Sequence, residues 1–142
     1  MAPYFIFLGA QKSGSSWLYA CLFEHPEIYS PIKEIHFFSR ERNWSKGYDW
    51  YENILSGAPN GAKSGEFSTS YFFDEDAPKR IHLRYPNAKL IACLRCPAER
   101  AYSNYLNSLR SGELLLGTSF EKAIELYPAI NNQGHYKKQL ER

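Results

Sequence analysis

Short apolar runs alternate with segments of helical spacing along most of the chain. Phe5–Leu8 and Lys89–Leu94 have the length and apolar character of buried strands, and Lys89–Leu94 is the strongest candidate. Lys63–Thr69 predicts a third, shorter strand. Apolar residues recur at helical spacing in the segments between and after these runs. The predicted helices are Ser15–Leu22, Gly47–Leu55, Asp74–Arg84, Pro97–Arg110 and Thr118–Tyr127.

This alternation predicts an α/β fold of three layers, in which helices flank both faces of a mainly parallel central sheet. The length of 142 residues is that of one domain, so a single domain over residues 1–142 is expected. The polar and basic stretch Ser39–Lys46 is expected to be a loop.

The segment Lys33–Phe38 alternates Glu34 and His36 with Ile35 and Phe37. In an extended conformation, successive side chains point to opposite faces. The pattern therefore predicts that the acid and the imidazole share one face, while the two apolar side chains are buried on the other.

A glycine-rich loop lies between the first predicted strand and the first predicted helix. It reads G-x-x-x-x-G-S-S from Gly9 to Ser16. Backbone N–H groups in such a loop and in the first turn of the next helix can bind an anion. The frame is that of a Walker A loop, but Ser15 stands where that motif has its lysine, and Lys12 is the only lysine inside the loop. The loop therefore predicts an anion site.

The end of the run Lys89–Leu94 indicates which anion this site would hold. The next residue is Arg95, and Ser103 follows two turns into the predicted helix. A magnesium-dependent nucleotide hydrolase needs an acidic residue near that place. A cation there disfavours a metal and favours a second anionic group, such as phosphate, that arginine contacts directly. Because ligands bind at the carboxyl ends of parallel strands, the loop and Arg95 are expected to face the same ligand.

Composition narrows the classes of partner and compartment. The net charge is +2, so nucleic acid is not an expected partner. The three cysteines, Cys21, Cys93 and Cys96, form no disulfide framework and predict reduced thiols in a cytoplasmic protein. Cys93 and Cys96 spell C-x-x-C, but no second ligand pair accompanies them, so no metal or redox site is expected. No apolar run is long enough for a membrane span, and the apolar N-terminus reads as a strand rather than a signal peptide.

Three blocks of the sequence carry a family resemblance: GAQKSGSSWLYACLFEHP, KEIHFF followed by KGYDWY, and LIACLRCPAERAYSNY. They resemble the sulfotransferases that use 3′-phosphoadenosine 5′-phosphosulfate (PAPS). The nearest likeness is to the heparan sulfate N- and 3-O-sulfotransferases and their bacterial relatives. The blocks occur in the family's order and cover most of Tyr4–Asn107. The resemblance implies a P-loop-like fold and transfer of a sulfuryl group to a hydroxyl or amine on a small molecule or a carbohydrate.

The resemblance also implies roles for individual residues. Glu34 would act as the base towards the acceptor with His36 close by, and Lys12 would stabilise the leaving phosphate. Arg95 and Ser103 would bind the 3′-phosphate. PAPS would be the donor and adenosine 3′,5′-bisphosphate (PAP) the product, with no metal required. The loop residues that would bind the 5′-phosphosulfate are Lys12, Ser13, Gly14, Ser15, Ser16 and Trp17.

Two features depart from the family pattern. Phe67 follows Glu66 where the heparan sulfate enzymes carry a lysine, and Glu66 becomes a candidate second acid. The family's catalytic domain continues past the position of Arg142 with a basic loop over the nucleotide, so a fragment or a shortened member is expected. Two rival functions remain open: a P-loop kinase that needs Mg²⁺ and ATP, and a non-catalytic module that binds a nucleotide without turnover.

Overall fold

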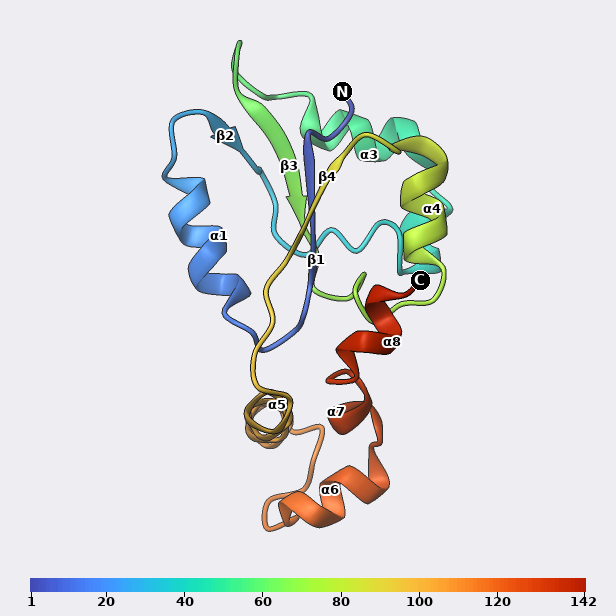
Figure 1. Ribbon diagram of the computed structural model, residues 1–142. Coiled ribbons are helices and arrows are strands. Elements are labelled where there is room, and N and C mark those ends of the chain that lie inside the picture. The colour runs from blue at the N-terminus through green and yellow to red at the C-terminus, as the bar shows by residue number, and fades with distance from the viewer.

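A parallel sheet forms the centre of the computed structural model, which describes residues 1–142 (Figure 1). Every neighbouring pair of strands in this four-stranded sheet is parallel. The predicted α/β class with a mainly parallel sheet is therefore confirmed. The strands, in the spatial order β2-β3-β1-β4, are β1 (Phe5–Gly9), β2 (Ile28–Tyr29), β3 (Lys63–Phe67) and β4 (Lys89–Ala92).

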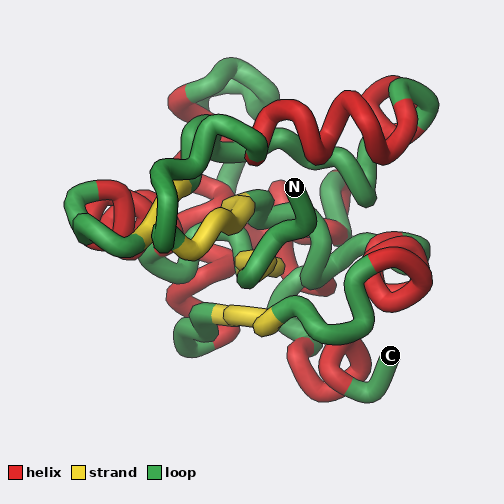
Figure 2. The backbone as a smooth tube through the Cα atoms, turned by 90° about the horizontal axis from the view of Figure 1, so that it is seen from above, coloured by secondary structure: helices red, strands yellow, loops and turns green.

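Helices flank both faces of the sheet, and further helices continue beyond the carboxyl ends of its strands. Helix α1 lies on one side of the sheet, α3 and α4 lie on the other, and α5 to α7 lie beyond the carboxyl ends of the strands (Figure 1). The view from above shows the helices around the strands (Figure 2). The helices are α1 (Ser15–Phe23), α2 (Glu41–Trp44), α3 (Gly47–Leu55), α4 (Ala77–Arg84), α5 (Pro97–Arg110), α6 (Phe120–Leu126), α7 (Ala129–Asn132) and α8 (Tyr136–Leu140).

Strand β1 divides its side chains between two cores. Phe5 and Phe7 pack on the α1 side with Phe67 of β3, and the ring centroids of Phe7 and Phe67 are 4.9 Å apart. Ile6 belongs to the larger core on the opposite side, under α3 and α4. Each fully buried side chain of this size contributes about 1.5–3 kcal/mol to folding. Burial on both faces fixes β1, and thereby the place where the glycine loop begins.

Strand β4 forms, but the prediction that it is deeply buried is wrong. It pairs only with β1 and lies at the edge of the sheet. Leu90 is 57% exposed, and Leu94 beyond the strand end is also exposed. An apolar run predicts a strand without showing how many neighbours that strand will have, and here β4 has one.

The segment Lys33–Phe38 is not a strand, which corrects the predicted extended conformation. Only Lys33 forms a bridge to β3, and the backbones of Glu34 and His36 are left-handed, with φ of 63° and 52°. Ile35 and Phe37 are buried as expected. The predicted loop that follows also contains the short helix α2. Ile35 and Phe37 pack into the core, and the left-handed backbone at Glu34 and His36 determines where these two polar side chains point.

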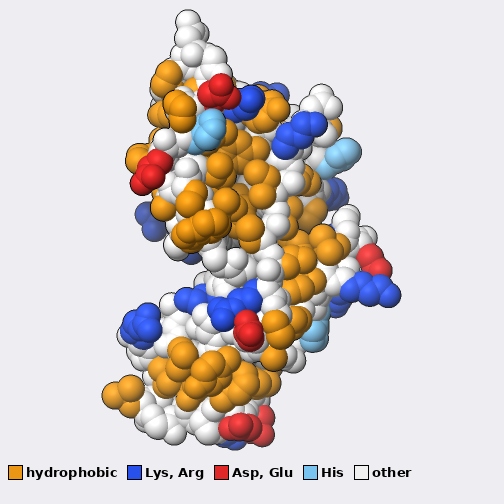
Figure 3. All heavy atoms as spheres, turned by 60° about the vertical axis from the view of Figure 1, so that its left-hand side comes forward, with side chains coloured by type: hydrophobic (Ala, Val, Ile, Leu, Met, Phe, Trp, Pro, Cys, Tyr) orange, Lys and Arg blue, Asp and Glu red, His pale blue; other side chains and the backbone are white.

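The helices after β4 build a small second core beside the sheet. Ala101 of α5 packs there with Leu114, Ala123 and Ile130. Lys and Arg side chains gather along the hollow between this helical part and the sheet (Figure 3). None of the helices has the length and apolar character needed to cross a membrane. The hollow at the carboxyl ends of the strands is where ligands bind in open α/β sheets.

Candidate active site

The glycine loop leaves the first turn of α1 open to a ligand. Gly9 has φ 130°, and a Cβ at this position would lie 2.6 Å from the carbonyl oxygen of Thr69, so only glycine fits. Gly14 caps α1 with φ 88°, and no side chain accepts a hydrogen bond from the first turn. The free N–H groups of that turn form an anion site at the positive end of the helix.

A polar cavity of about 350 Å³ lies beside this helix end. It brings together residues from all three blocks of the sequence, and no apolar side chain lines it. The predicted convergence of the loop, Arg95 and Ser103 on one site is therefore seen in the structure. We call it the donor cavity, because the family resemblance would place the sulfuryl donor there. The residues that line it are Gln11, Lys12, Gly14, Ser15, Ser16, Lys33, Glu34, Thr69, Arg95, Ser103 and Asn107.

Two predicted loop residues do not line the donor cavity. The Trp17 side chain is 73% exposed, so any contact with a donor would come from its N–H in the first turn. The Ser13 hydroxyl is buried and has no hydrogen-bond partner. A buried polar group without a partner costs free energy, and an anion in the loop would be a suitable acceptor.

The positive charges in and near the donor cavity repel one another. Lys12 Nζ donates to Asn107 Oδ1 at 3.0 Å. Partial burial lowers the pKa of Lys12, and the nearby charges of Arg110 and Lys33 lower it further. Arg95 is partly exposed and donates from Nε to Glu99 at 3.0 Å. A bound anion would relieve this repulsion, because an opposite charge nearby stabilises each cation.

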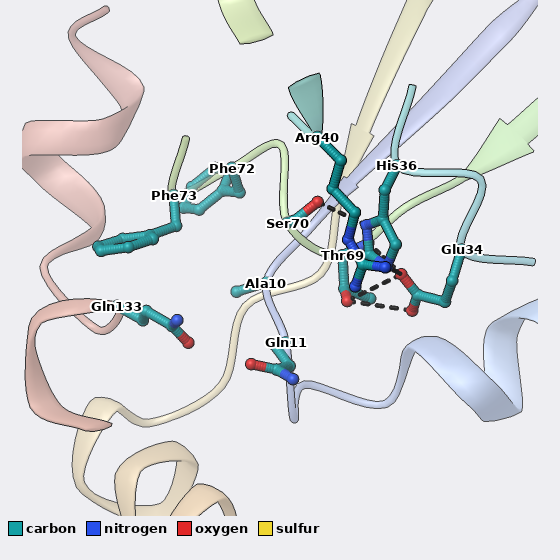
Figure 4. A pocket seen from close by; sticks show the side chains of 10 residues that line it. All are labelled: Ala10, Gln11, Glu34, His36, Arg40, Thr69, Ser70, Phe72, Phe73 and Gln133. Carbon is teal, nitrogen blue, oxygen red and sulfur yellow. Dashed lines mark hydrogen bonds and ion pairs between the residues drawn. The ribbon is translucent and has the colours of Figure 1, made fainter. Parts of the chain in front are cut away.

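The Glu34 carboxylate is held by several donors at once. Oε2 accepts from the backbone N–H of Thr69 at 3.0 Å, and Oε1 accepts from the Thr69 hydroxyl at 3.0 Å. His36 Nε2 lies 3.2 Å from Oε2, and Lys33 Nζ lies 3.5 Å from Oε1. Figure 4 shows the carboxylate pointing towards Thr69 and the His36 ring. These contacts fix the position of a candidate general base.

His36 is predicted to act close to Glu34, and the structure brings the two together. Burial is the main cause that lowers the pKa of His36, Arg40 and Lys33 lower it further, and Glu34 opposes the shift. The imidazole is therefore neutral near pH 7 and carries one N–H. Its Nδ1 lies 2.7 Å from the Ser70 hydroxyl. With Nδ1 accepting from Ser70, Nε2 carries the proton and lies 3.2 Å from Glu34 Oε2.

A second cavity, of about 370 Å³, is also lined by Glu34 (Figure 4). Glu34, Gln11 and Thr69 line both cavities, so the carboxylate stands at their boundary. We call it the acceptor cavity, because the family resemblance would place the acceptor beside Glu34. Aromatic rings and amide groups lie around it (Figure 4). The residues that line it are Ala10, Gln11, Glu34, His36, Arg40, Thr69, Ser70, Phe72, Phe73 and Gln133.

Comparison with known proteins decides the family. The model of the sulfotransferase domain family matches residues 3–142. The chain belongs to the sulfotransferase domain family. The fold agrees: a sulfotransferase from Alicyclobacillus acidocaldarius superposes with a TM-score of 0.81 at 30% identity, over 99% of this chain and 67% of that one. The predicted P-loop-like sulfotransferase fold is thus confirmed.

The similar proteins include heparan sulfate enzymes. Human bifunctional heparan sulfate N-deacetylase/N-sulfotransferase 3 is 39% identical over 111 residues, which is 72% of this chain and 13% of that protein. Human heparan sulfate glucosamine 3-O-sulfotransferase 6 is 35% identical over 107 residues, 75% of this chain and 31% of that protein. The chain therefore spans less than a third of the length of either enzyme.

Glu66 lies in the core of this sulfotransferase domain, and the structure does not support its role as a second acid of the site. It is fully buried and lines neither cavity. Its carboxyl accepts hydrogen bonds from the hydroxyls of Tyr51 at 2.7 Å and Ser68 at 2.6 Å, and from Tyr71. Ser68 also accepts from the backbone N–H of His36 at 2.8 Å, so Glu66 supports the active-site segment from behind.

This burial predicts a stability that depends on pH. Burial raises the pKa of Glu66 to about 7 from an ordinary 4.5, against the opposing effect of its hydroxyl donors. Between these values the folded chain holds a proton that the unfolded chain has lost. The stabilisation is full below pH 4.5 and is lost as the pH rises through 7. The free energy of unfolding should fall by about 3 kcal/mol across this window.

Urea denaturation at a series of pH values measures this fall. Glu66→Gln cannot ionise and should remove most of the slope between pH 4.5 and 7. Glu125→Gln, a matched change on the exposed surface of α6, should leave the slope intact. Parallel curves for the wild type and Glu66→Gln would show that Glu66 titrates normally.

Several residues of the site were not predicted from the sequence. Lys33, Thr69 and Asn107 line the donor cavity, and Arg40 lines the acceptor cavity. Thr69 follows the end of β3, so the rule that ligands lie at the carboxyl ends of parallel strands could have identified it. No local signal marks Asn107, because its contact with Lys12 spans 95 residues.

Proposed function

We propose that this domain transfers a sulfuryl group from PAPS to a hydroxyl or amine acceptor, with a carbohydrate as the preferred class of acceptor. The observation that carries the proposal is the position of Glu34 at the boundary of two cavities. One cavity has the N–H groups and cations that suit an anionic donor, and the other has space and polar groups for an acceptor.

The donor cavity fits the 5′-phosphosulfate and the 3′-phosphate chemically. The open first turn of α1 is available for anionic oxygens. Arg95 and Ser103 would hold the 3′-phosphate, because a guanidinium and a hydroxyl both donate to phosphate oxygens. The loop from Lys12 to Ser16 would hold the 5′-phosphosulfate, with the Trp17 N–H contributing from the first turn.

In the proposed reaction, the acceptor atom forms a bond to sulfur while the bond from sulfur to the bridging oxygen of the 5′-phosphate breaks. The bridging oxygen keeps the electron pair, and Glu34 takes the proton that the acceptor loses. Lys12 stabilises the negative charge that grows on the leaving phosphate. Neutral His36, whose Nε2 lies 3.2 Å from Glu34 Oε2, helps to position the carboxylate beside the acceptor. The protein supplies charge, position and a base for this step.

The side chains that line the acceptor cavity support a carbohydrate as the acceptor. Phe73 presents an exposed aromatic ring beside the buried Phe72, while Gln11 and Gln133 present amides that can donate to and accept from hydroxyl groups (Figure 4). The names of the heparan sulfate relatives point to the same class of acceptor.

The cysteines bear on the compartment. Cys21, Cys93 and Cys96 are free thiols, which supports a reducing compartment such as the cytoplasm.

One pair of measurements separates this proposal from its rivals. Thermal stabilisation by PAP is compared with stabilisation by ATP and Mg²⁺, and sulfate transfer from labelled PAPS is then assayed on a panel of sugars, alcohols and amines. The proposal expects preference for PAP together with transfer. Preference for ATP and Mg²⁺ would favour the kinase, and binding of PAP without transfer would favour the non-catalytic module.

Arg95→Ala tests the assignment of the 3′-phosphate site. Loss of a charge-assisted contact should weaken PAP binding by about 10- to 100-fold. Binding of AMP, which lacks the 3′-phosphate, should change little. Calorimetric titration of both nucleotides measures the difference, and Arg42→Ala on the exposed surface of α2 is the matched control. A variant that still prefers PAP over AMP by the wild-type factor would refute this assignment.

A further inference from the structure

Lys33 occupies a position between the two halves of the proposed reaction. Its Nζ donates to the Ser16 hydroxyl in the first turn of α1 at 3.0 Å. The same Nζ lies 3.5 Å from Glu34 Oε1. One ammonium group therefore touches both the helix end that would bind the donor and the carboxylate that would act as base.

The backbone explains how two neighbouring side chains reach the same cavity. Lys33 is held to the end of β3 by its bridge to Phe67, and the Glu34 N–H donates to the Phe67 carbonyl at 2.6 Å. In a strand, adjacent side chains would point to opposite faces. The left-handed backbone of Glu34, with φ 63°, breaks that alternation, and both side chains line the donor cavity.

The chemistry of the site gives this position a purpose. A sulfuryl donor and an ionised carboxylate are both negative, and the reaction needs them close together. Their repulsion in a partly buried cavity would be stronger than in water. A donor oxygen that accepts a hydrogen bond from the Ser16 hydroxyl would lie about 2.7 Å from Ser16 Oγ. Lys33 Nζ is bound to the same Oγ, so it would lie close to that donor oxygen. A cation at this point attracts both anions.

We propose that Lys33 is a bridging cation that allows the anionic donor and the ionised base Glu34 to occupy the site together. Lys33 binds the sulfuryl end of the donor and keeps its contact with Glu34, so it serves binding and positioning at once. The role rests on the proposed function, because it concerns the donor of that reaction. It differs from the role of Lys12, which lies in the loop and contacts Asn107.

Affinities for PAPS and PAP, measured by calorimetry without an acceptor, test this role. Lys33→Met should weaken PAPS binding by about tenfold, and PAP binding, which involves no sulfuryl group, by about threefold. Lys33→Arg keeps the charge and should restore most of the PAPS affinity. Lys63→Met makes the same charge change at the opposite end of β3 and should alter neither affinity.

The double variant distinguishes bridging from simple anion binding. With Glu34→Gln the repulsion is gone, so adding Lys33→Met should weaken PAPS binding only about threefold, compared with tenfold when Glu34 is present. An equal or larger loss in the Glu34→Gln background would overturn the bridging role, because Lys33 would then act independently of Glu34 or compete with it. Failure of the wild type to bind PAPS or PAP would overturn the proposed function itself, and this inference with it.

Discussion

Glu34→Gln should reduce sulfate transfer on the order of 10³-fold, because an amide cannot take the proton that the acceptor loses. The amide oxygen can still accept from the Thr69 N–H that now binds the carboxylate at 3.0 Å. The segment should therefore keep its place, and PAP affinity should stay within about threefold of the wild-type value. The expected result is a large loss of turnover in a protein that folds and binds nucleotide normally.

Three measurements on the same sample check this prediction: transfer from labelled PAPS, PAP affinity by calorimetry, and the midpoint of thermal unfolding. Glu125→Gln on α6 is the control, since it removes one exposed carboxylate far from the cavities. Activity above a tenth of the wild-type rate in Glu34→Gln would assign the base to another group. A fall in PAP affinity as large as the fall in turnover would mean that Glu34 mainly maintains the donor cavity.

The donor site was predictable because its residues lie in contiguous stretches whose ends the sheet brings together. The glycine loop follows β1 and Arg95 follows β4, and parallel neighbours place those ends side by side. Ser103 lies about two turns into α5, which begins at Pro97 shortly after Arg95, and both residues line the same cavity. The order of residues within these stretches and one rule of sheet topology are therefore sufficient to predict these site residues.

The pair of Glu34 and His36 was predicted correctly from an incorrect conformation. The alternating pattern required one shared face, and the structure places His36 Nε2 3.2 Å from Glu34 Oε2. The cause is two left-handed residues in a segment pinned at Lys33, which no pattern of polar and apolar residues encodes. Backbone of this kind in non-glycine residues is held by tertiary contacts, here those from Thr69 and Ser68.

Contacts across long sequence separations account for the site residues that the sequence did not reveal. Lys33 meets Ser16 across 17 residues, and Thr69 meets Glu34 across 35. The error at Glu66 has a different cause: its carboxyl is buried in the core, where the hydroxyls of Tyr51, Ser68 and Tyr71 converge on it. From the sequence Glu66 is a candidate catalytic acid, but in the folded domain it is a structural residue. The sequence does not reveal this, because burial depends on the packing of the whole domain.

Lys12→Met should lower turnover by about 10²- to 10³-fold, because Lys12 meets a charge that grows only as the bond from sulfur to the bridging oxygen breaks. Methionine has a similar length and the same backbone cost at φ 66°, so the variant changes the charge and little else. PAP affinity should fall far less than turnover, by several-fold. Steady-state rates over a range of PAPS concentrations, together with PAP titration, measure the two effects separately.

The division between kcat and KM decides what Lys12 does. An interaction made only in the transition state lowers kcat and kcat/KM equally, whereas uniform binding raises KM and leaves kcat unchanged. We expect the first pattern, because Asn107 holds the ammonium in place at 3.0 Å before any charge develops. Lys122→Met, which removes an exposed ammonium on α6, should change neither constant. A rise in KM alone would make Lys12 a binding residue and would leave the leaving phosphate to be stabilised by Lys33 and the first turn of α1.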